Sequence, residues 1–407
     1  MTGQAQALRG RVVTPETVIE DGVVVLDGAT IDWVGTASDA AAAGHGDVVA
    51  RTPRPDDGRY VLPGLVDLHC HGGGGASFPD AEDAAAAQHA VDEHRRHGTT
   101  SLVASLVAAP PAALRAGVRI LADLADAGEI AGIHLEGPFL SVVRCGAQDP
   151  EHILDPDPAL TDALLELGRG HVATMTLAPE LPGSVGDDGV AARLVAGGAL
   201  PSWGHTDAGP AETRQALAES RAQLAEAVGA RSARPTVTHL FNGMHPWHHR
   251  DPGPIGECLA AARRGDVVVE LIGDGTHLDP ATVREVYELV GRENAVLVTD
   301  AMAAAGMPDG SYRLGPQEVT VADGVARLTY GDSIAGGTAH LLDVVRTTVA
   351  GGVPLVDAVY MASAGPAAVL GAAEAGALVA GGRADVVVTD AALHPVHVVR
   401  HGQEVTR

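Results

Sequence analysis

Short apolar runs alternate with Ala-rich amphipathic stretches through the middle of the chain. Apolar residues recur at helical spacing in 81–98, 211–229 and 281–292, which predicts helices there. The apolar runs predict eight buried strands: Leu65–His71, Thr100–Leu106, Gly132–Glu136, Val172–Leu177, Leu200–His205, Thr236–His239, Val267–Ile272 and Ala295–Asp300. Eight strands that alternate with helices predict an α/β fold with a closed (β/α)8 barrel.

The two ends of the chain have a different pattern. Segments 22–35 and 384–405 alternate apolar and polar residues between Gly and Asp, which predicts short strands joined by turns. We therefore expect a small, discontinuous β-sandwich domain built from residues 1–60 and 375–407. The barrel would then span 61–374, with a β-hairpin insertion near 311–332.

Composition and net charge exclude some classes of partner and of chemistry. The chain has 407 residues, 46% hydrophobic and only 3% aromatic, which suits an aliphatic core of parallel strands. With 27 basic and 52 acidic residues, the net charge of −25 disfavours nucleic acid and anionic membranes as partners. An anionic substrate would need a local basic pocket. The sequence has no lysine, which excludes Schiff-base chemistry and a metal bridge made from a modified lysine.

The number of cysteines and the composition of the N-terminal residues indicate the cellular compartment that we expect. Three scattered cysteines are too few for a disulfide framework, and the N-terminus has no apolar signal segment. No run of about 18 apolar residues without charges occurs, so we expect no membrane span. These features predict a cytoplasmic enzyme.

The motif DLHCHGGGG, residues 67–75, places two histidines at the end of the first barrel strand. Side chains alternate along a strand, so His69 and His71 share one face with Asp67, while Cys70 points to the other. The glycines that follow remove side-chain bulk, which lets a ligand or loop approach closely.

Four more strands end in residues that bind metals: Glu136, His205, His239 and Asp300. The carboxyl ends of barrel strands converge on one rim, so these residues and the histidine pair should meet. Imidazole and carboxylate ligands suit zinc, iron(II), manganese or cobalt. We expect Glu136 to bridge two ions. His205 and His239 would hold one, and His69 with His71 would help to hold the other.

Other histidines and the cysteine beside the pair have simpler interpretations. His134 shares a strand face with Glu136 but lies deeper, which favours a hydrogen-bonded core residue. We expect His94 and His97, on a polar helix, to be solvated. The remaining residues of this kind are loop residues or an inert buried thiol: His245, His248, His249 and Cys70.

The motifs taken in order resemble the amidohydrolase superfamily, and within it the N-acetylglucosamine-6-phosphate deacetylase family. The resemblance covers nearly the whole chain and rests on LPGLVDLHCHGGGG, HLEGPFL, GHTDA, THLFNGMH, GDGTHL, LVTDAMAAAGMPDGSYRLG and SIAGGTAHLLDVV. The histidine pair indicates only the superfamily. HLEGPF with THLFNGM and TDAMAAAG is specific to the deacetylases.

The resemblance implies hydrolysis of N-acetylglucosamine 6-phosphate to glucosamine 6-phosphate and acetate. It assigns Glu136, His205 and His239 to the main metal and Asp300 to acid–base work. His69 and His71 would hold a second ion, which gives one or two divalent metals per subunit, zinc first among them. Metal coordination lowers the pKa of bound water toward ~7, and a carboxylate can pass the water's proton to the departing amine.

The resemblance also implies which residues surround the substrate: Ala147, Gln148, Asn242, Gly243, Arg250, Asp274, His277, Ile334, Ala335 and Gly336. Arg250 and His277 would contact the phosphate, with Arg250 reaching the site of a neighbouring subunit in a homodimer. Gln148 departs from the family, which often has a histidine there. An amide can donate a hydrogen bond to a carbonyl but cannot carry a proton charge.

Three alternatives stay open at this point. The enzyme could act on the galactosamine 6-phosphate epimer, or it could be a different amidohydrolase acting on cyclic amides or N-acyl amino acids. A third alternative is an inactive barrel that serves as a binding protein. Such a protein usually loses ligands or the acid–base carboxylate, and this chain keeps all of them.

Overall fold

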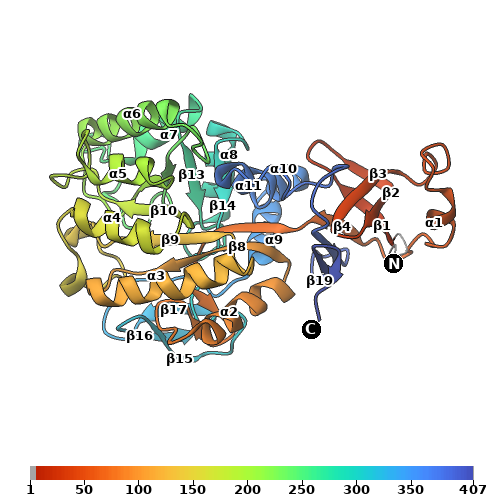
Figure 1. The fold of residues 1–407 in the computed structure, drawn as a ribbon, viewed down its shortest axis with the longest axis horizontal. Coiled ribbons are helices and arrows are strands. Elements are labelled where there is room, and N and C mark those ends of the chain that lie inside the picture. The colour runs from red at the N-terminus through yellow and green to blue at the C-terminus, as the bar shows by residue number, and fades with distance from the viewer. Residues whose placement is uncertain (1–5, 407) are drawn as a thin grey trace.

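The computed structural model describes residues 6–406. Residues 1–5 and 407, which the expected β domain includes, lie outside the described residues. Eight parallel strands form the barrel (Figure 1): β5 (Leu65–Cys70), β8 (Thr99–Leu106), β9 (Gly132–Glu136), β10 (Val172–Leu177), β11 (Leu200–Trp203), β12 (Thr236–Val237), β13 (Val268–Leu271) and β14 (Ala295–Leu297). The predicted barrel is confirmed.

The barrel closes between its first and last strands at the carboxyl rim. Cys70 and Ala301 form a parallel bridge, and the main-chain N–H of Asp300 donates to the carbonyl of His69 at 2.9 Å. The rim therefore places residues after β14 beside residues at the end of β5. Closure is what brings Asp300 to the histidine pair.

Several strands end earlier than the hydrophobic pattern predicts. His205, His239 and Asp300 follow β11, β12 and β14 instead of ending them. Their φ angles are 47°, 26° and 47°, in the left-handed region that non-glycine residues rarely adopt. Such strain persists where the surrounding structure imposes it, and it gathers at functional sites.

Helices cover the outside of the barrel (Figure 1). They are α2 (Ala84–Arg96), α3 (Pro111–Asp126), α4 (Pro158–Leu167), α5 (Val190–Ala196), α6 (Pro210–Glu226), α7 (Ile255–Arg263), α8 (Pro280–Val290), α9 (Leu341–Ala350), α10 (Leu355–Met361) and α11 (Ala364–Leu370). Asp83, Asp157 and Asp279 cap three of them by accepting main-chain N–H bonds in the first turn. None of the helices in residues 6–406 is long and apolar enough to cross a membrane.

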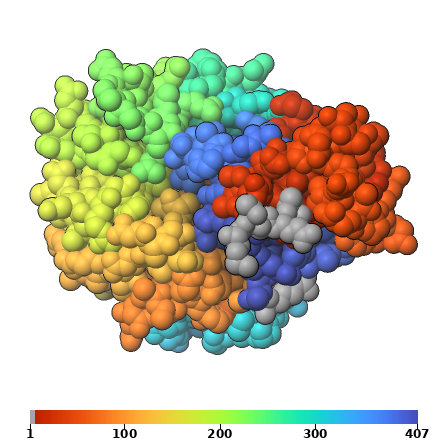
Figure 2. All heavy atoms as spheres, turned by 45° about the vertical axis from the view of Figure 1, so that its right-hand side comes forward, coloured from red at the N-terminus to blue at the C-terminus, as the bar shows by residue number. Residues whose placement is uncertain are grey.

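The second domain is a seven-stranded sheet that joins both ends of the chain. Its red N-terminal and blue C-terminal segments lie beside the barrel (Figure 2). Strand β4 pairs with β1 on one side and β18 on the other, which links the termini. The strands and one short helix are β1 (Gln6–Val13), β2 (Val18–Asp27), β3 (Thr30–Thr36), α1 (Gly46–Ala50), β4 (Tyr60–Pro63), β18 (Val386–Thr389), β19 (Pro395–Arg400) and β20 (Gln403–Glu404).

The expected hairpin after the last barrel strand is a three-stranded antiparallel sheet. Its strands are β15 (Gly310–Leu314), β16 (Gln317–Ala322) and β17 (Val325–Leu328). A second tight turn at 323–324, with positive φ at both residues, adds the third strand. The glycines after β5 form a smaller hairpin of β6 (Gly72–Gly73) and β7 (Ala76–Ser77).

Candidate metal centre

The predicted ligands converge at the barrel mouth in two groups that share one carboxylate. One group is Glu136, His205 and His239, and the other is His69, His71, Glu136 and Asp300. In the first group, Oε1 of Glu136 lies 2.9 Å from Nε2 of His205 and 2.9 Å from Nε2 of His239. The strand ends therefore meet as the barrel topology predicts.

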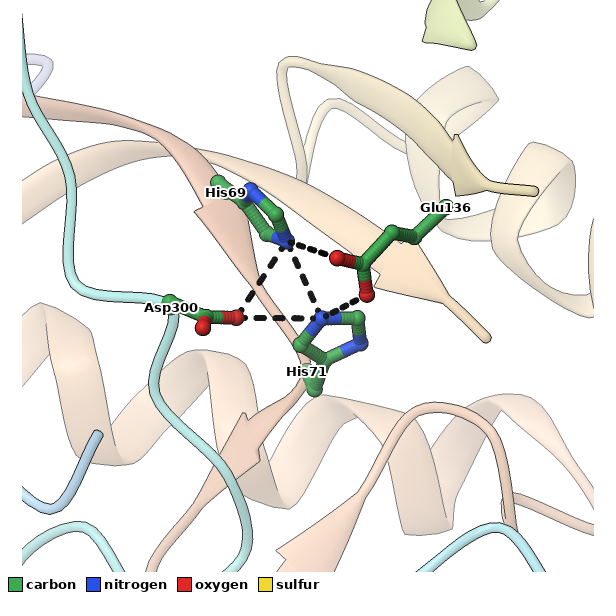
Figure 3. Close-up of side chains that lie close together, drawn as sticks. All are labelled: His69, His71, Glu136 and Asp300. Atoms are coloured by element: carbon green, nitrogen blue, oxygen red, sulfur yellow. Dashed lines mark hydrogen bonds and ion pairs between the residues drawn. The ribbon is translucent and has the colours of Figure 1, made fainter. Parts of the chain in front are cut away.

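The second group contacts both oxygens of Glu136, with Nε2 of His69 3.9 Å from Oε1 (Figure 3). Oε2 of Glu136 lies 3.1 Å from Nε2 of His71, and Oδ1 of Asp300 lies 3.3 Å from Nε2 of both His69 and His71. The Nε2 atoms of His69 and His71 are 3.0 Å apart. All four side chains point toward one another from β5 and the residue after it, from the end of β9 and from the segment after β14.

The electrostatics of both groups favour a positive charge between the ligands. Burial raises the pKa of Glu136, but hydrogen bonds from His205 and His239 outweigh burial and hold that pKa well below its usual range. Burial lowers the pKa of His71, yet Asp300 and Glu136 raise it on balance. Ring nitrogens and carboxylate oxygens packed this closely suit a divalent cation, which neutralises both acids at once.

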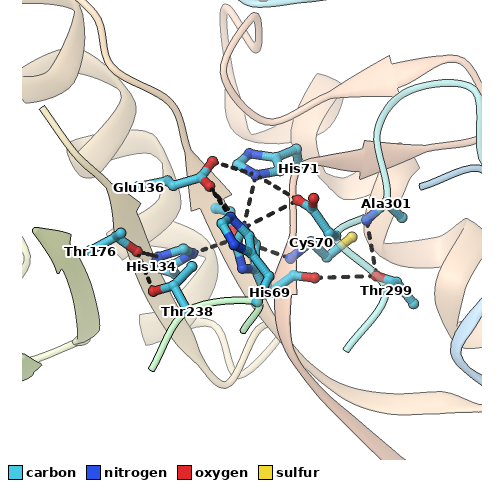
Figure 4. Close-up of polar contacts among 12 residues, drawn as sticks. His69, Cys70, His71, His134, Glu136, Thr176, Thr238, Thr299 and Ala301 are labelled. Carbon is cyan, nitrogen blue, oxygen red and sulfur yellow. Dashed lines mark hydrogen bonds and ion pairs between the residues drawn. The ribbon is translucent and has the colours of Figure 1, made fainter. Parts of the chain in front are cut away.

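Polar side chains fill the barrel below these ligands (Figure 4). The ring of His134 lies edge-on to that of His69, and its nitrogens contact Ser105 Oγ at 3.0 Å and Thr176 Oγ1 at 2.8 Å. Burial lowers the pKa of His134 well below its usual value, so the ring is neutral. The interpretation of His134 as a hydrogen-bonded core histidine is confirmed.

The expectation that His94 is solvated is wrong. The His94 ring is fully buried, and its Nε2 lies 2.8 Å from the carbonyl of Gly72 and 3.2 Å from Sγ of Cys70. Helix α2 directs His94 inward, against the glycine loop formed by residues 72–75. Its polar neighbours in sequence therefore do not indicate that His94 is buried. His97 is half-buried and stacks on the ring of His340 at 3.6 Å between centroids.

A pocket of about 340 Å³ opens above the ligands. It is lined by most of the predicted site residues: His71, Glu136, Ala147, Gln148, His205, His239, Asn242, Gly243, His277, Asp300, Ile334 and Gly336. His69 and Ala335 are fully buried and do not line the pocket. Arg250 is exposed and does not line the pocket of its own chain.

Two of the lining residues are held by specific partners. Gln148 is buried, donates from Nε2 to Oε2 of Glu136 at 2.6 Å and accepts the N–H of Ala108 through Oε1. His277 Nδ1 lies 2.8 Å from Oδ2 of Asp274, which leaves its Nε2 4.0 Å from Asp300. The amide and this imidazole therefore face the two carboxylates of the centre.

Sequence reasoning missed three charged residues at this site, and one of them, Asp332, lines the pocket just after β17. Arg327, on β17, is the only arginine among the described residues that line the pocket. Glu270, on β13, is buried and contacts His69. A carboxylate inside the apolar run VVVELIG was the available signal for Glu270. Arg327 carried no such signal, because its position depends on the third strand of the insertion.

Residues 60–405 match the amidohydrolase family. The chain is 34% identical over 340 residues to the N-acetylglucosamine-6-phosphate deacetylase of Lysinibacillus sphaericus, covering 82% of each protein. It is 33% identical over 354 residues to the N-acetylgalactosamine-6-phosphate deacetylase of Escherichia coli O157:H7, covering 85% of this chain and 88% of that protein.

A solved structure extends the similarity to the whole chain. It is a mutant N-acetyl-D-glucosamine-6-phosphate deacetylase from Mycobacterium smegmatis in complex with N-acetyl-D-glucosamine-6-phosphate, with a TM-score of 0.86, 39% identity and coverage of 100% of both chains. The order of the motifs, the barrel and these relatives agree. The chain belongs to the amidohydrolase family, among the N-acetylglucosamine-6-phosphate deacetylases, and is a hydrolase.

Proposed function

We propose that the protein hydrolyses the acetamide of N-acetylglucosamine 6-phosphate to glucosamine 6-phosphate and acetate. The observation that carries this proposal is the shared carboxylate, Glu136, which joins two ligand groups at the floor of one pocket. Relatives that bear the name of this activity share the fold and about a third of the sequence.

In this proposal Glu136, His205 and His239 hold one divalent ion, and His69 and His71 complete a second site with Glu136. An ion bound there supplies Lewis acidity, which activates water and polarises a carbonyl. Zinc is the first ion to test, and iron(II), manganese and cobalt suit the same ligands.

Asp300 is the proposed general base and acid. Burial raises its pKa, but the contacts with His69 and His71 lower it on balance. The carboxylate is therefore ionised at neutral pH and can accept a proton from the attacking water at one of its Oδ atoms. It then delivers this proton to the amide nitrogen, because an unprotonated amine anion is a poor leaving group.

The other predicted residues would bind and orient the sugar. Asn242, Gly243, Ile334 and Gly336 line the pocket, and Asp274 fixes the ring of His277. We propose that the exposed Arg250 contacts the phosphate in a neighbouring subunit of a homodimer. A guanidinium provides the planar, permanently charged fork that suits phosphate.

One kinetic comparison tests this assignment. Acetate release is measured with N-acetylglucosamine 6-phosphate, with its galactosamine epimer and with unphosphorylated N-acetylglucosamine. The highest kcat/KM with the phosphorylated glucosamine compound supports the proposal. Equal rates with and without phosphate would remove Arg250 and His277 from substrate recognition. A preference for the epimer would favour the second candidate, which the Escherichia coli relative suggests by its name.

A further inference from the structure

Glu270 is a buried carboxylate that the proposed reaction leaves without a role. It lies on β13, its side chain is 2% exposed, and it does not line the pocket. An ionised carboxylate away from water is costly unless hydrogen bonds compensate for the lost hydration. Both of its side-chain partners belong to the metal centre.

The first partner is the ring of His69. Nδ1 of His69 lies 3.3 Å from Oε2 of Glu270, while Nε2 of the same ring faces His71 and Asp300. A carboxylate only accepts hydrogen bonds, so Nδ1 carries the hydrogen of this contact. The lone pair of Nε2 then points into the cluster, as a metal ligand requires.

The second partner is the main chain of His239. The same oxygen of Glu270 accepts the N–H of His239 at 3.2 Å, and the carbonyl of Glu270 accepts the N–H of Leu240 at 2.9 Å. His239 has a φ of 26°, so a specific hydrogen bond at this strained position restricts its main chain. One oxygen therefore contacts a ligand residue from each of the two groups.

The other three imidazoles lack an equivalent partner. Nδ1 of His205 contacts the carbonyl of Arg144 at 2.8 Å. In the described part of the chain, Nδ1 of His71 and Nδ1 of His239 have no hydrogen-bond partner. His69 is thus the one ligand ring of the four whose outer nitrogen is held by a carboxylate.

We propose that Glu270 is a positioning residue that holds His69 in the metal-binding tautomer and makes the second ion site tight. This inference rests on the proposed function only for the presence of a divalent ion. A carboxylate behind a histidine ligand orients the ring and raises its basicity, and loss of such a partner weakens metal affinity by about 10- to 100-fold. The ion held by His205 and His239 should depend less on Glu270, because Glu270 contacts the main chain of His239 and not its ring.

The experiment measures zinc affinity by chelator competition and counts bound equivalents in the wild type, Glu270→Gln and Glu270→Leu. Glu257→Gln is the matched control, because it makes the same change on α7, where Glu257 forms an ion pair with Arg214 of α6. We expect one of the two bound equivalents to lose about 10- to 100-fold in affinity in Glu270→Gln, and to be absent in Glu270→Leu. The control should match the wild type.

Cobalt substitution provides a second measurement. The visible spectrum of the cobalt protein reports ligand geometry, so Glu270→Gln should change the band of one site and leave the other. If Glu270→Leu does not fold, Glu270→Gln carries the test, because glutamine keeps the size of the side chain but loses the negative charge that raises the basicity of His69. Wild-type affinity for both ions in Glu270→Gln and Glu270→Leu overturns the proposal, as does an equal loss of both ions.

The proposed role of Glu270 and the proposed function can each be contradicted without the other. A wild type that binds two ions but releases no acetate from any of the sugars contradicts the function and leaves the role of Glu270 standing. A wild type that binds ions and releases acetate, with unchanged metal affinity in both Glu270 variants, contradicts only this inference. A wild type that binds no second ion overturns it.

Discussion

Oε2 of Glu136 lies 3.1 Å from Nε2 of His71, across the mouth of the barrel. The other oxygen of this carboxylate lies 2.9 Å from His205 and from His239. A single glutamate thus contacts ligands from both groups. Two ions bound on either side would share this anion.

Asp300→Asn should lower kcat by about 10²- to 10⁴-fold, because asparagine can neither accept nor deliver the proton. KM should change little, since the amide keeps the size of the side chain. Steady-state acetate release measures both constants, and metal analysis of the same sample checks that the ligand groups still bind. Full activity in this variant would remove Asp300 from the mechanism.

Gly243→Ala should disturb His205. A Cβ at Gly243 would lie 2.7 Å from Nδ1 of His205, and the φ of +60° adds strain for any other residue. Gly229→Ala is the control, because Gly229 has a φ of +76° but nothing within 4 Å of its added Cβ. Both should lose about 1–2 kcal/mol of stability from the left-handed conformation. Only Gly243→Ala should reduce metal content, and equal metal content in the two variants would contradict this.

Gln148→Ala should weaken the centre through Glu136. It removes the amide that donates to Oε2 of Glu136 and the oxygen that accepts the N–H of Ala108. Leaving such buried groups unpaired costs about 1–3 kcal/mol, which a thermal unfolding series measures. Gln148→His should retain more activity than Gln148→Ala, because an imidazole can donate at the same place. The opposite order would contradict a donor role for Gln148.

His340→Gln should change the pH dependence of stability. Burial lowers the pKa of His340, but hydrogen bonds with Asp343 and Glu93 raise it above 6.5 on balance. A raised pKa means that the stability from protonated His340 is present below pH 6.5 and is lost as pH rises through the folded value. Unfolding by denaturant should show the largest wild-type advantage near pH 5.5 and a smaller one near pH 9.

At acidic pH, the stability difference between the wild type and His340→Gln should change in the opposite direction. The hydrogen bond from His340 lowers the pKa of Glu93 from 4.5 to about 2, so stability from this carboxylate is lost as pH falls toward 2. Arg96 and His97 also face Glu93, so part of this loss should remain in the variant. A wild-type advantage that does not change between pH 5.5 and pH 9 would contradict the assignment.

Periodicity and topology were enough to predict the barrel. Strand ends converge on one rim whatever the loop details, so Glu136, His205, His239 and Asp300 could be grouped without coordinates. The exact domain boundaries stay a prediction. Sequence alone could not show that His205, His239 and Asp300 leave the extended conformation, because left-handed backbone in non-glycine residues is imposed by tertiary contacts.

The sequence did not predict the surroundings of His94 and Glu270, and each case has a physical reason. His94 was expected to be solvated because its helix neighbours are polar, yet the glycine loop packs against that helix face and buries it. Glu270 looked like part of an apolar strand, since its partner His69 is far away in sequence. Interactions across the barrel interior join residues whose spacing carries no local signal.

We propose that Glu136, His205, His239, His69 and His71 jointly bind the ions that the hydrolysis requires. The most direct measurement titrates metal-free protein with zinc and follows bound zinc and acetate release from N-acetylglucosamine 6-phosphate in the same samples. We predict that acetate release appears with the bound ions, reaches a plateau at up to two per chain, and is absent in metal-free protein. Full acetate release from the metal-free protein, or zinc binding that Glu136→Ala leaves unchanged, would contradict the account.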